Sequence, residues 1–387
     1  MRRIINVRLP QTSQNFSLNN IWWVGLDKQN LIVELQPMGN EEDQLDTDED
    51  WKQDFLSPMG IDLQINGGLG LTFNQLSYQD LPKLLKLLDQ LWLDGVEGIC
   101  PTLITCKINQ LRDSLNVLRE ARQSHRSNRC QLLGAHLEGP FIDKSHLGVH
   151  PEKDIELPSL EGLEKRIQGF EKEIAMMTLA PELPGAKAVI KELNQKQIIS
   201  CLGHSNAKRT DCDLAFKDGV TMLTHAFNAM NGLHHREPGP VGAAISNGNI
   251  GLGLIADGKH ISPLIASILN KLAPQNLILV SDALFPYGLK DGKYLWGNRE
   301  LTVKKGTCKI TNGRLAGTTL PLLDGCKNLA KWIQDPAAAI WAATIAPREI
   351  LWGKASINKY LLGQPLSRLI RWTDQPGNES IHWRQAA

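Results

Sequence analysis

The chain has 387 residues, of which 42% are hydrophobic, and its 42 Lys and Arg nearly balance its 41 Asp and Glu. The apolar fraction supports a large buried core and argues against a disordered chain. A net charge of +1 gives no general attraction to nucleic acid or to anionic lipid. Any anionic substrate must therefore meet a local positive site.

The sequence lacks the features of a secreted or membrane protein. The amino terminus has no long apolar run of the signal-peptide kind, and no stretch of about 18 uncharged apolar residues occurs. The seven cysteines form no CxxC pair and are odd in number, which favours a reduced set over disulfides. We therefore expect a cytoplasmic protein with no membrane partner and no nucleic-acid partner.

The two ends of the chain differ in character from its middle. Residues 1–57 contain strand-like runs broken by polar turns, and the acidic segment 40–54 is predicted to be a solvated loop. The strand-like runs are 4–9, 20–26 and 30–37. Residues 354–387 again have short apolar runs between turn residues. We predict that 1–57 and 354–387 form one small β domain and that 58–353 form a separate domain.

From Pro58 onward, apolar strand-like runs alternate with amphipathic helical patterns. The eight strand-like runs are 60–65, 97–104, 130–138, 174–182, 197–204, 220–225, 249–257 and 276–282. The clearest helical patterns between them are 81–95, 111–122 and 207–219. Alternating strands and helices predict a parallel sheet of the α/β class, and eight such units predict a closed (β/α)8 TIM-type barrel.

Chemically capable side chains stand at the carboxyl end of nearly every predicted strand. They are Gln64, Asn66, Glu138, His204, His225, Asp257 and Asp282. A barrel gathers these strand ends on one face, where its active sites lie. A single buried histidine is more often a packing residue. However, the carboxylate of Glu138 with the imidazoles of His204 and His225 suits a zinc-like ion that keeps one position for water.

Asp282 ends the last predicted strand. An aspartate beside a metal site can act as a general base and then as a general acid. The alternative interpretation is a structural aspartate that caps the following helix. Its place in the barrel order favours the catalytic role.

The first predicted strand has a polar face. In GIDLQING, residues 60–67, the side chains of Asp62, Gln64 and Asn66 point to the same side. Polar groups on so apolar a strand need hydrogen-bonding partners, because burying them without partners costs stability. The pattern itself does not say what these partners are.

Five motifs along the chain resemble the N-acetylglucosamine-6-phosphate deacetylase family of the amidohydrolase superfamily. They are HLEGPF (136–141), GHSNA (203–207), THAFNAMNGLHHREPGPVGAA (224–244), IADGKH (255–260) and SDA (281–283). The resemblance spans roughly residues 58–353 and implies a metal-dependent (β/α)8 barrel and a homodimer. It also implies hydrolysis of N-acetyl-D-glucosamine 6-phosphate to D-glucosamine 6-phosphate and acetate, in amino-sugar catabolism and recycling.

The resemblance assigns roles by position. It implies that Glu138, His204 and His225 hold the metal and that Asp282 is catalytic. It implies substrate contacts for Val149, His150, Asn228, Ala229, Arg236, Asp257, Gly258, Lys259, His260, Leu315, Ala316 and Gly317.

Two of these positions carry a more specific expectation. We expect His150 to help hold the developing oxyanion. We expect the planar guanidinium of Arg236 to bind the phosphate, with a surface ion pair to Glu237 as the alternative. His260 and backbone N–H groups near Asn228 could add to that phosphate site.

The polar face of the first strand bears on the metal count. Most amidohydrolases carry His-x-His at this strand end, and here the two positions are Gln64 and Asn66. Neutral amides are poor ligands for zinc-like ions but good hydrogen-bonding partners. A subgroup of these deacetylases has the same two amides and is linked to a single-metal site. We expect both amides at the active-site mouth and one divalent metal per chain, Zn²⁺ first, with Fe²⁺, Co²⁺ or Mn²⁺ as alternatives.

The resemblance weakens at the C-terminus, where LGQPLSRLIRWT (362–373) keeps only the outline of the family's late strand. Two other functions stay open from the sequence. One is an amidohydrolase that acts on a different N-acyl amino sugar, and the other is a catalytically silent sugar-phosphate binder. Comparing acetate release from phosphorylated and free sugars would separate the first from the deacetylase, and ligand binding by metal-replete protein without acetate release would indicate the second.

Overall fold

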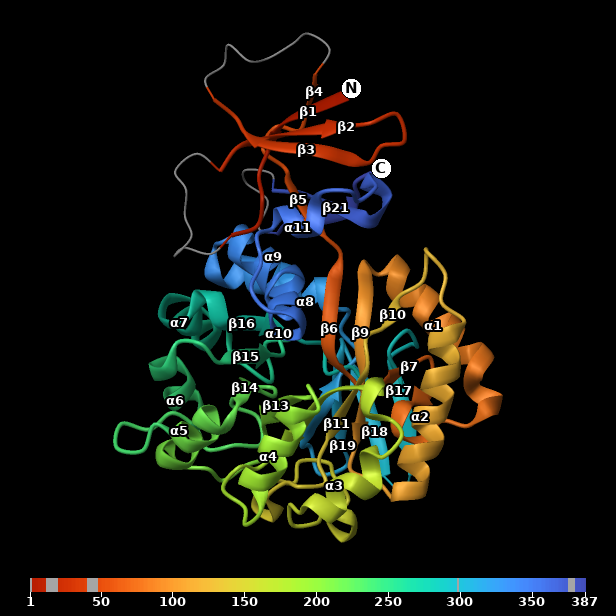
Figure 1. Ribbon diagram of the computed structural model, residues 1–387, viewed down its shortest axis with the longest axis vertical. Helices are drawn as coiled ribbons and strands as arrows, with labels where there is room; N and C mark the ends of the chain where they lie inside the picture. The colour runs from red at the N-terminus through yellow and green to blue at the C-terminus, as the bar shows by residue number, and fades with distance from the viewer. Residues whose placement is uncertain (1, 12–19, 40–47, 298, 375–379) are drawn as a thin grey trace.

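The chain forms a barrel with a small β domain above it (Figure 1). The structure, a computed structural model, describes residues 2–11, 20–39, 48–297, 299–374 and 380–387. The two chain ends lie together in the small domain, although the barrel separates them in sequence.

Eight parallel strands build the barrel and pair in the order in which they follow one another in the chain. They are β6 (Gly60–Ile65), β9 (Val96–Ile104), β11 (Ala135–Glu138), β12 (Ile174–Leu179), β13 (Ile199–Leu202), β14 (Val220–Leu223), β15 (Gly251–Leu254) and β16 (Leu277–Leu279). The short β10 (Gln131–Leu132) also pairs with β9. Each strand coincides with one of the eight runs predicted from the sequence, with β9 starting one residue earlier, so the α/β barrel prediction is confirmed.

The barrel closes just beyond β16. The backbone N–H of Asp282 donates to the carbonyl of Gln64 at 2.8 Å, and that of Asn66 donates to the carbonyl of Ala283 at 2.7 Å. This closure brings Asp282 against the polar face of β6. Asp282 is therefore placed where it can contact Gln64 and Asn66.

Amphipathic helices cover the outside of the barrel. They are α1 (Leu81–Leu93), α2 (Ile108–Gln123), α3 (Leu160–Ile167), α4 (Ala186–Gln195), α5 (Arg209–Asp218), α6 (Gly239–Asn247), α7 (Pro263–Leu272) and α8 (Leu322–Ile333). In α1, for example, Leu84, Leu87, Leu88 and Leu91 are buried, at the spacing that places them on one helical face. The apolar stripe of each helix thus packs on the sheet.

Two further helices close the barrel at the end next to the small domain. They are α9 (Pro336–Thr344) and α10 (Ala346–Trp352). Trp341 and Ile345 share a buried cluster with Ile61 and Ile278, which lie inside the barrel. This end is therefore filled with apolar side chains, and the opposite end is free to carry a site.

The small domain draws on both chain ends. One sheet has the order β3-β2-β1-β4 and another has the order β22-β21-β5. The strands are β1 (Arg2–Val7), β2 (Trp22–Leu26), β3 (Ile32–Pro37), β4 (Glu49–Asp50), β5 (Phe55–Pro58), β21 (Leu369–Thr373) and β22 (His382–Gln385). Leu361 of α11 (Asn358–Leu361) and Leu369 share one core with Ile4 and Leu26. A small β domain from both ends is confirmed, while its boundaries at 57/58 and 353/354 stay a prediction.

The acidic segment differs from its prediction. Residues 40–47 lie outside the described residues. From residue 48 onward the solvated-loop prediction is wrong, because Trp51 is only 1% exposed and Asp54 accepts a hydrogen bond from Arg371 at 2.6 Å. Basic side chains of the small domain therefore pair with these acidic residues, and Trp51 packs in the apolar core.

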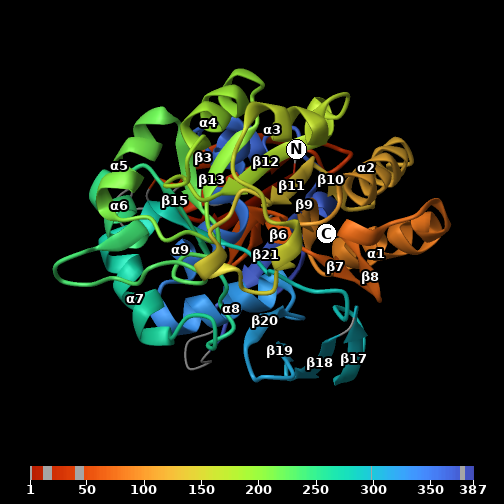
Figure 2. The same ribbon diagram turned by 90° about the horizontal axis from the view of Figure 1, so that it is seen from below.

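An antiparallel sheet that was not predicted follows β16. Its strands are β17 (Gly292–Trp296), β18 (Arg299–Lys304), β19 (Thr307–Ile310) and β20 (Leu315–Thr318). It has its own small core, which includes Phe285, Leu301 and Val303. Figure 2, seen from the end opposite the small domain, shows this sheet at the side of the barrel. Thr318 N donates to Asp282 O at 3.1 Å, so β20 returns the chain to the barrel mouth.

All seven cysteines are buried and free, in agreement with a reduced set. Within the described ranges, no helix is both long enough and apolar enough to cross a membrane. A short ribbon of β7 (Gly67–Gly68) and β8 (Leu71–Thr72) completes the strands that follow β6.

Candidate active site

A cavity of about 570 Å³ opens at the carboxyl ends of the barrel strands. Its wall includes Asn66, Glu138, His204, His225 and Asp282, which come from five different strand ends. The loop at 144–150 and the β17–β20 sheet supply much of the remaining wall. Five of the seven strand-end side chains singled out in the sequence thus line one opening.

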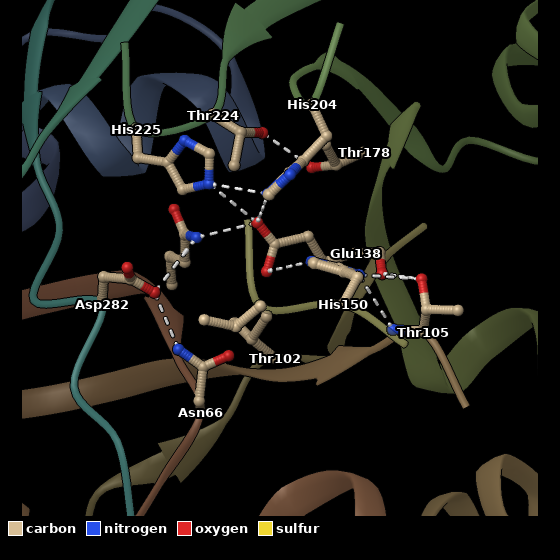
Figure 3. Close-up of polar contacts among 12 residues, drawn as sticks. Asn66, Thr102, Thr105, Glu138, His150, Thr178, His204, Thr224, His225 and Asp282 are labelled. Carbon is tan, nitrogen blue, oxygen red and sulfur yellow. Dashed lines mark hydrogen bonds and ion pairs between the residues drawn. The ribbon is translucent and has the colours of Figure 1, made fainter. Parts of the chain in front are cut away.

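Three of these side chains converge on one point. The Oε1 atom of Glu138 lies 3.1 Å from His204 Nε2 and 3.0 Å from His225 Nε2, and the two nitrogens are 3.1 Å apart. All three residues are buried. Figure 3 shows them meeting in the barrel mouth beside Asp282 and Asn66. This group has the composition and spacing of a three-ligand metal site.

The hydrogen bonds around these atoms fit a cation. His204 Nδ1 donates to the carbonyl of His146 at 2.8 Å, so in the neutral ring Nε2 carries a lone pair. That lone pair faces a carboxylate oxygen, which is also an acceptor, and the Nε2 of His225, which is a third acceptor when that ring carries its proton on Nδ1. Three acceptors so close repel one another unless a proton or a metal ion lies between them. A divalent ion satisfies all three at once, and the carbonyl of His146 fixes the tautomer that this requires.

The backbone is strained where it presents these side chains. The φ angles of His204, His225 and Asp282 are +49°, +31° and +46°, in the left-handed region that non-glycine residues rarely adopt. Each such residue costs on the order of 1 kcal/mol or more. The strain occurs directly after β13, β14 and β16, where it turns each side chain into the cavity. Its concentration at one opening indicates a functional site.

Asp282 is held by the two amides of β6. Its Oδ1 accepts from Asn66 Nδ2 at 2.7 Å and from Gln64 Nε2 at 3.3 Å. Gln64 Nε2 also lies 3.2 Å from Glu138 Oε1. One amide group therefore links the candidate catalytic carboxylate to the candidate metal ligand. This is what the polar face of GIDLQING contacts.

The two carboxylates of the site have opposite pKa shifts. Burial alone would raise the pKa of Glu138, but when the imidazoles of His204 and His225 are protonated, their hydrogen bonds and charge outweigh burial and hold that pKa well below its usual range. Burial raises the pKa of Asp282 to about 7. One carboxylate thus stays ionised and can bind a cation, whereas the other can take up and release a proton near neutral pH.

His150 is a neutral donor aimed at the same place. Its Nδ1 accepts from Thr105, whose hydroxyl oxygen is 2.8 Å away and whose backbone nitrogen is 3.4 Å away. The ring proton is therefore on Nε2, which lies 3.9 Å from Glu138 Oε2. Burial, assisted by the neighbouring His204, lowers the pKa of His150 to about 3, which keeps the ring uncharged.

His136 is excluded as a further ligand. Its Nδ1 donates to the carbonyl of Leu63 at 3.0 Å and its Nε2 accepts from the hydroxyl of Thr178 at 2.7 Å. With both ring nitrogens engaged inside the barrel, this buried histidine links β11 to β12 and, across the barrel interior, to β6. This geometry fits a structural histidine rather than a metal ligand.

Comparison with known proteins places the chain in a family. No family model matches it. It is 31% identical over 311 residues to the N-acetylglucosamine-6-phosphate deacetylase of Vibrio furnissii, covering 79% of this chain and 77% of that protein. The chain belongs to the N-acetylglucosamine-6-phosphate deacetylase family.

Two further members of this deacetylase family extend the comparison. The chain is 33% identical over 301 residues to the N-acetylgalactosamine-6-phosphate deacetylase of Escherichia coli O157:H7, covering 77% of this chain and 78% of that protein. The crystal structure of the N-acetylglucosamine-6-phosphate deacetylase of Pasteurella multocida matches with a TM-score of 0.78 over 99% of each chain, at 25% identity. The barrel and the small domain thus both belong to the architecture of this deacetylase family.

The substrate positions expected from the deacetylase family fall into two groups. Those on the cavity wall are Val149, His150, Asn228, Ala229, His260, Leu315 and Ala316. Those that are not among the wall residues are Arg236, Asp257, Gly258, Lys259 and Gly317. The substrate-contact roles of both groups stay predictions.

Two residues of the second group contact residues that line the cavity. Asp257 Oδ2 accepts from His260 Nδ1 at 2.8 Å, which fixes the ring that faces the cavity. Gly317 has a φ of +138°, and a Cβ atom there would lie 2.7 Å from the carbonyl oxygen of Asp282. Only glycine allows β20 to approach the catalytic candidate this closely.

Within a single chain, Arg236 does not line the cavity, where its predicted role in phosphate binding would place it. It is exposed, in the segment that joins β14 to α6. Part of this segment projects away from the barrel beside α5 and α6 in both views (Figures 1 and 2). The alternative ion pair with Glu237 does not form either, since the Glu237 carboxylate instead accepts from the backbone of Arg209 at 2.8 Å.

Sequence reasoning missed several wall residues. They are Ile104, Lys144, Ser145, His146, Leu147, Gly148, Ile255, Leu284, Trp296 and Arg314. The weak signal for Trp296 was the alternation of apolar and polar residues at 292–304, typical of strands. The signal for Lys144 was its place in the short polar connection that follows HLEGPF.

Proposed function

We propose that the chain hydrolyses the acetamide of N-acetyl-D-glucosamine 6-phosphate to D-glucosamine 6-phosphate and acetate. The observation that carries this proposal is that Glu138, His204 and His225 converge on one point. A single side-chain amide, that of Gln64, then hydrogen-bonds to both Glu138 and Asp282. Membership of the deacetylase family supports the choice of reaction.

The cofactor of this reaction is proposed to be one divalent metal ion per chain. Glu138, His204 and His225 would hold it, with Zn²⁺ as the first choice and Fe²⁺, Co²⁺ or Mn²⁺ as alternatives. Such an ion supplies the chemistry that the side chains lack, because it lowers the pKa of water enough to provide hydroxide at neutral pH.

Asp282 would carry the proton. In the described part of the chain its hydrogen bonds from Gln64 and Asn66 both go to Oδ1, so Oδ2 is the atom left to accept a proton from the attacking water. The water oxygen bonds to the acetyl carbon as the carbon–nitrogen bond breaks. Asp282 then returns the proton to the leaving nitrogen, and acetate and the free amine result.

Replacement of His150 by asparagine is expected to lower kcat by about 10²- to 10³-fold, the usual cost of one oxyanion donor. The reason is that the Nε2 proton of His150 faces the reacting group, while Nδ1 is occupied by Thr105. The check is steady-state kinetics that resolves kcat from KM. A variant with unchanged kcat and a raised KM would make His150 a binding group instead.

The direct test of the proposed function is acetate release from N-acetylglucosamine 6-phosphate, with metal content measured on the same sample. Free N-acetylglucosamine serves as the unphosphorylated comparison. Binding of the sugar phosphate to metal-replete protein without any acetate release would indicate the silent binder instead.

A second candidate substrate is N-acetylgalactosamine 6-phosphate, which is favoured by the relative from Escherichia coli O157:H7. The two sugars differ only in the configuration of one hydroxyl group. The ratio of their kcat/KM values, measured on one preparation, decides which is preferred.

We further propose a homodimeric cytoplasmic enzyme of amino-sugar catabolism and recycling. Seven free, buried cysteines are typical of a reducing compartment. The dimer rests on resemblance to the family and is tested by measuring molar mass in solution.

A further inference from the structure

A series of hydrogen bonds crosses the barrel interior next to the candidate metal ligands. His136 Nδ1 donates to the carbonyl of Leu63 at 3.0 Å, and its Nε2 accepts from the hydroxyl of Thr178 at 2.7 Å. Since this uses the only hydroxyl proton of Thr178, Thr178 Oγ1 accepts from the hydroxyl of Thr224 at 2.6 Å. We call His136, Thr178 and Thr224 the interior bridge. All three side chains are fully buried.

The interior bridge joins backbone segments that carry the candidate metal ligands. Thr224 is the residue before His225, and Thr178 is the register partner of Glu138 where β11 pairs with β12. His136 lies two residues before Glu138 on the same strand. Figure 3 shows the two threonines beside the ligand histidines. A displacement of any member of the interior bridge would therefore displace a segment that carries a ligand.

The third ligand, His204, follows a residue that is packed between the same two threonines. A Cβ atom on Gly203 would lie 2.8 Å from Thr178 Cγ2 and 2.9 Å from Thr224 Cβ. Such distances are shorter than Cβ contacts in real structures, so only glycine fits here without a shift of its neighbours. The two threonines thus hold the segment before His204 by direct contact.

At its other end, the interior bridge holds an irregular part of β6. The register between β6 and β9 shifts between Asp62 and Ile65, as it does at a β-bulge. Within this stretch the carbonyl of Leu63 accepts from His136. Bulges beside active sites redirect side chains, and the side chain directed here is Gln64, whose amide contacts both carboxylates of the site.

Packing alone does not require polar groups at this level of the barrel. Met176 lies two residues before Thr178 on β12, on the same strand face and further from the mouth, and it belongs to an apolar cluster with Ile61 and Met222. Burying a histidine and two hydroxyl groups costs more desolvation than burying apolar groups. A fully hydrogen-bonded network compensates for this cost and fixes one arrangement of the strands.

We propose that the interior bridge holds the metal ligands in place, so that His136, Thr178 and Thr224 are positioning residues that tighten metal binding without contacting the ion. This inference rests on the proposed function, which places one divalent ion on the three ligands. Groups that orient metal ligands from outside contribute about 10- to 100-fold to metal affinity. We expect about 10-fold, the lower end of that range, because the interior bridge acts through the backbone.

Replacing Thr178 with valine tests the centre of the interior bridge, because valine keeps the shape of the side chain and removes the hydroxyl. The affinity for Zn²⁺, measured by competition with a chelator of known affinity, is expected to fall about 10-fold. The visible absorption of the Co²⁺-substituted protein should change, since it reports the geometry of the ligands. Thr178→Ser keeps the hydroxyl and should recover most of the affinity and the wild-type spectrum.

Thr344→Val is the matched control. Thr344 is fully buried in α9 at the far end of the barrel, and its hydroxyl donates to the carbonyl of Ile340 at 2.7 Å. Both valine variants lose one buried, hydrogen-bonded hydroxyl and should lower the Tm of the metal-free protein. Only Thr178→Val should weaken Zn²⁺ binding. Equal Zn²⁺ affinities and identical Co²⁺ spectra in the two variants would make the interior bridge a purely structural feature and overturn the proposal.

Two substitutions of His136 separate the two ends of the interior bridge. His136→Gln places an amide near the former Nε2 position and can keep a hydrogen bond to Thr178. His136→Asn places an N–H donor near the former Nδ1 position and can keep the hydrogen bond to Leu63. We expect His136→Gln to bind Zn²⁺ more tightly than His136→Asn, because the threonines contact the segments of two ligands. Equal or reversed affinities would overturn this assignment.

Metal binding and turnover are measured separately, so the two proposals can fail separately. If the wild type binds Zn²⁺ but releases no acetate from N-acetylglucosamine 6-phosphate, the proposed function fails and the Zn²⁺ affinities still test the interior bridge. If the wild type binds no divalent ion, the interior bridge has no metal ligands to position, and the inference is overturned.

Discussion

Replacing Asp282 with asparagine is expected to lower kcat for acetate release by about 10²- to 10⁴-fold, the range for loss of a general acid–base group. Asparagine keeps an oxygen where Asp282 Oδ1 accepts from Asn66 at 2.7 Å and from Gln64 at 3.3 Å. The side chain should therefore stay in place while it loses the ability to carry a proton. Steady-state kinetics together with metal analysis of the variant tests this.

The same substitution should stabilise the metal-free protein. Burial raises the folded-state pKa of Asp282 from 3.8 to about 7, so folding favours the neutral carboxyl. The stability that this carboxyl contributes is fully present below pH 3.8 and is lost as the pH rises to about 7. Above that pH the wild type carries a buried charge that the asparagine variant lacks. The variant should then be more stable by on the order of a few kcal/mol.

Thermal unfolding in a chelator at pH 5 and pH 8 tests the sign. The Tm difference between Asp282→Asn and wild type should be positive and larger at pH 8. Asp62→Asn is the matched control, because burial raises the pKa of Asp62 to about 6 and its Oδ1 accepts from the backbone of Gln64 and Ser281. It should gain stability at neutral pH without the large loss of kcat. Comparable losses of kcat in both variants would contradict a proton-carrying role specific to Asp282.

The site could be predicted as far as it depends on strand order. Glu138, His204 and Asp282 stand at strand ends, and closure of a parallel barrel must bring such ends together. Gln64 and Asn66 could be placed at the mouth for the same reason. Their partner could not be named, because it depends on the hydrogen bonds that join β6 to the residues after β16.

Features that depend on contacts across the fold were not predictable. The β17–β20 sheet turns at Lys305 and Gly306, which both have positive φ, and a lysine gives little sign of such a turn. Arg314 gains its position only because that sheet packs beside the mouth. In the acidic segment, the burial of Trp51 and Asp54 depends on Arg371, which is more than three hundred residues away in the chain.

Replacing Glu138 with glutamine is expected to remove both metal and turnover. The amide has no charge and is a poor ligand for zinc-like ions. Losing a residue that only supports a metal ligand costs up to about 100-fold in metal affinity, so losing the ligand itself should cost more than that. Wild type should contain one divalent ion per chain by elemental analysis. Adding metal to the chelated wild type should raise its Tm, since binding only to the folded state stabilises it, whereas Glu138→Gln should show no such rise.

A carboxylate at the other end of the barrel provides the control. Glu97 pairs with Arg348, which also donates to the carbonyl of Met59 at 2.9 Å. Glu97→Gln should lower the Tm but keep one ion per chain and full turnover. If Glu138→Gln retained a full metal content, the three-ligand assignment would be wrong.

The proposed count of one ion is supported by where Gln64 of β6 and Asn66, the residue after β6, direct their amide hydrogens. Gln64 Nε2 lies between Glu138 and Asp282, 3.2 Å from one carboxylate and 3.3 Å from the other. Asn66 Nδ2 also points at Asp282. Carboxylate oxygens accept hydrogen bonds, so they fix the amide N–H groups in this direction. A second cation that bridged the same carboxylates would meet these N–H groups rather than lone pairs. Two tightly bound ions in active wild type would therefore require both amides to turn, and would contradict this arrangement.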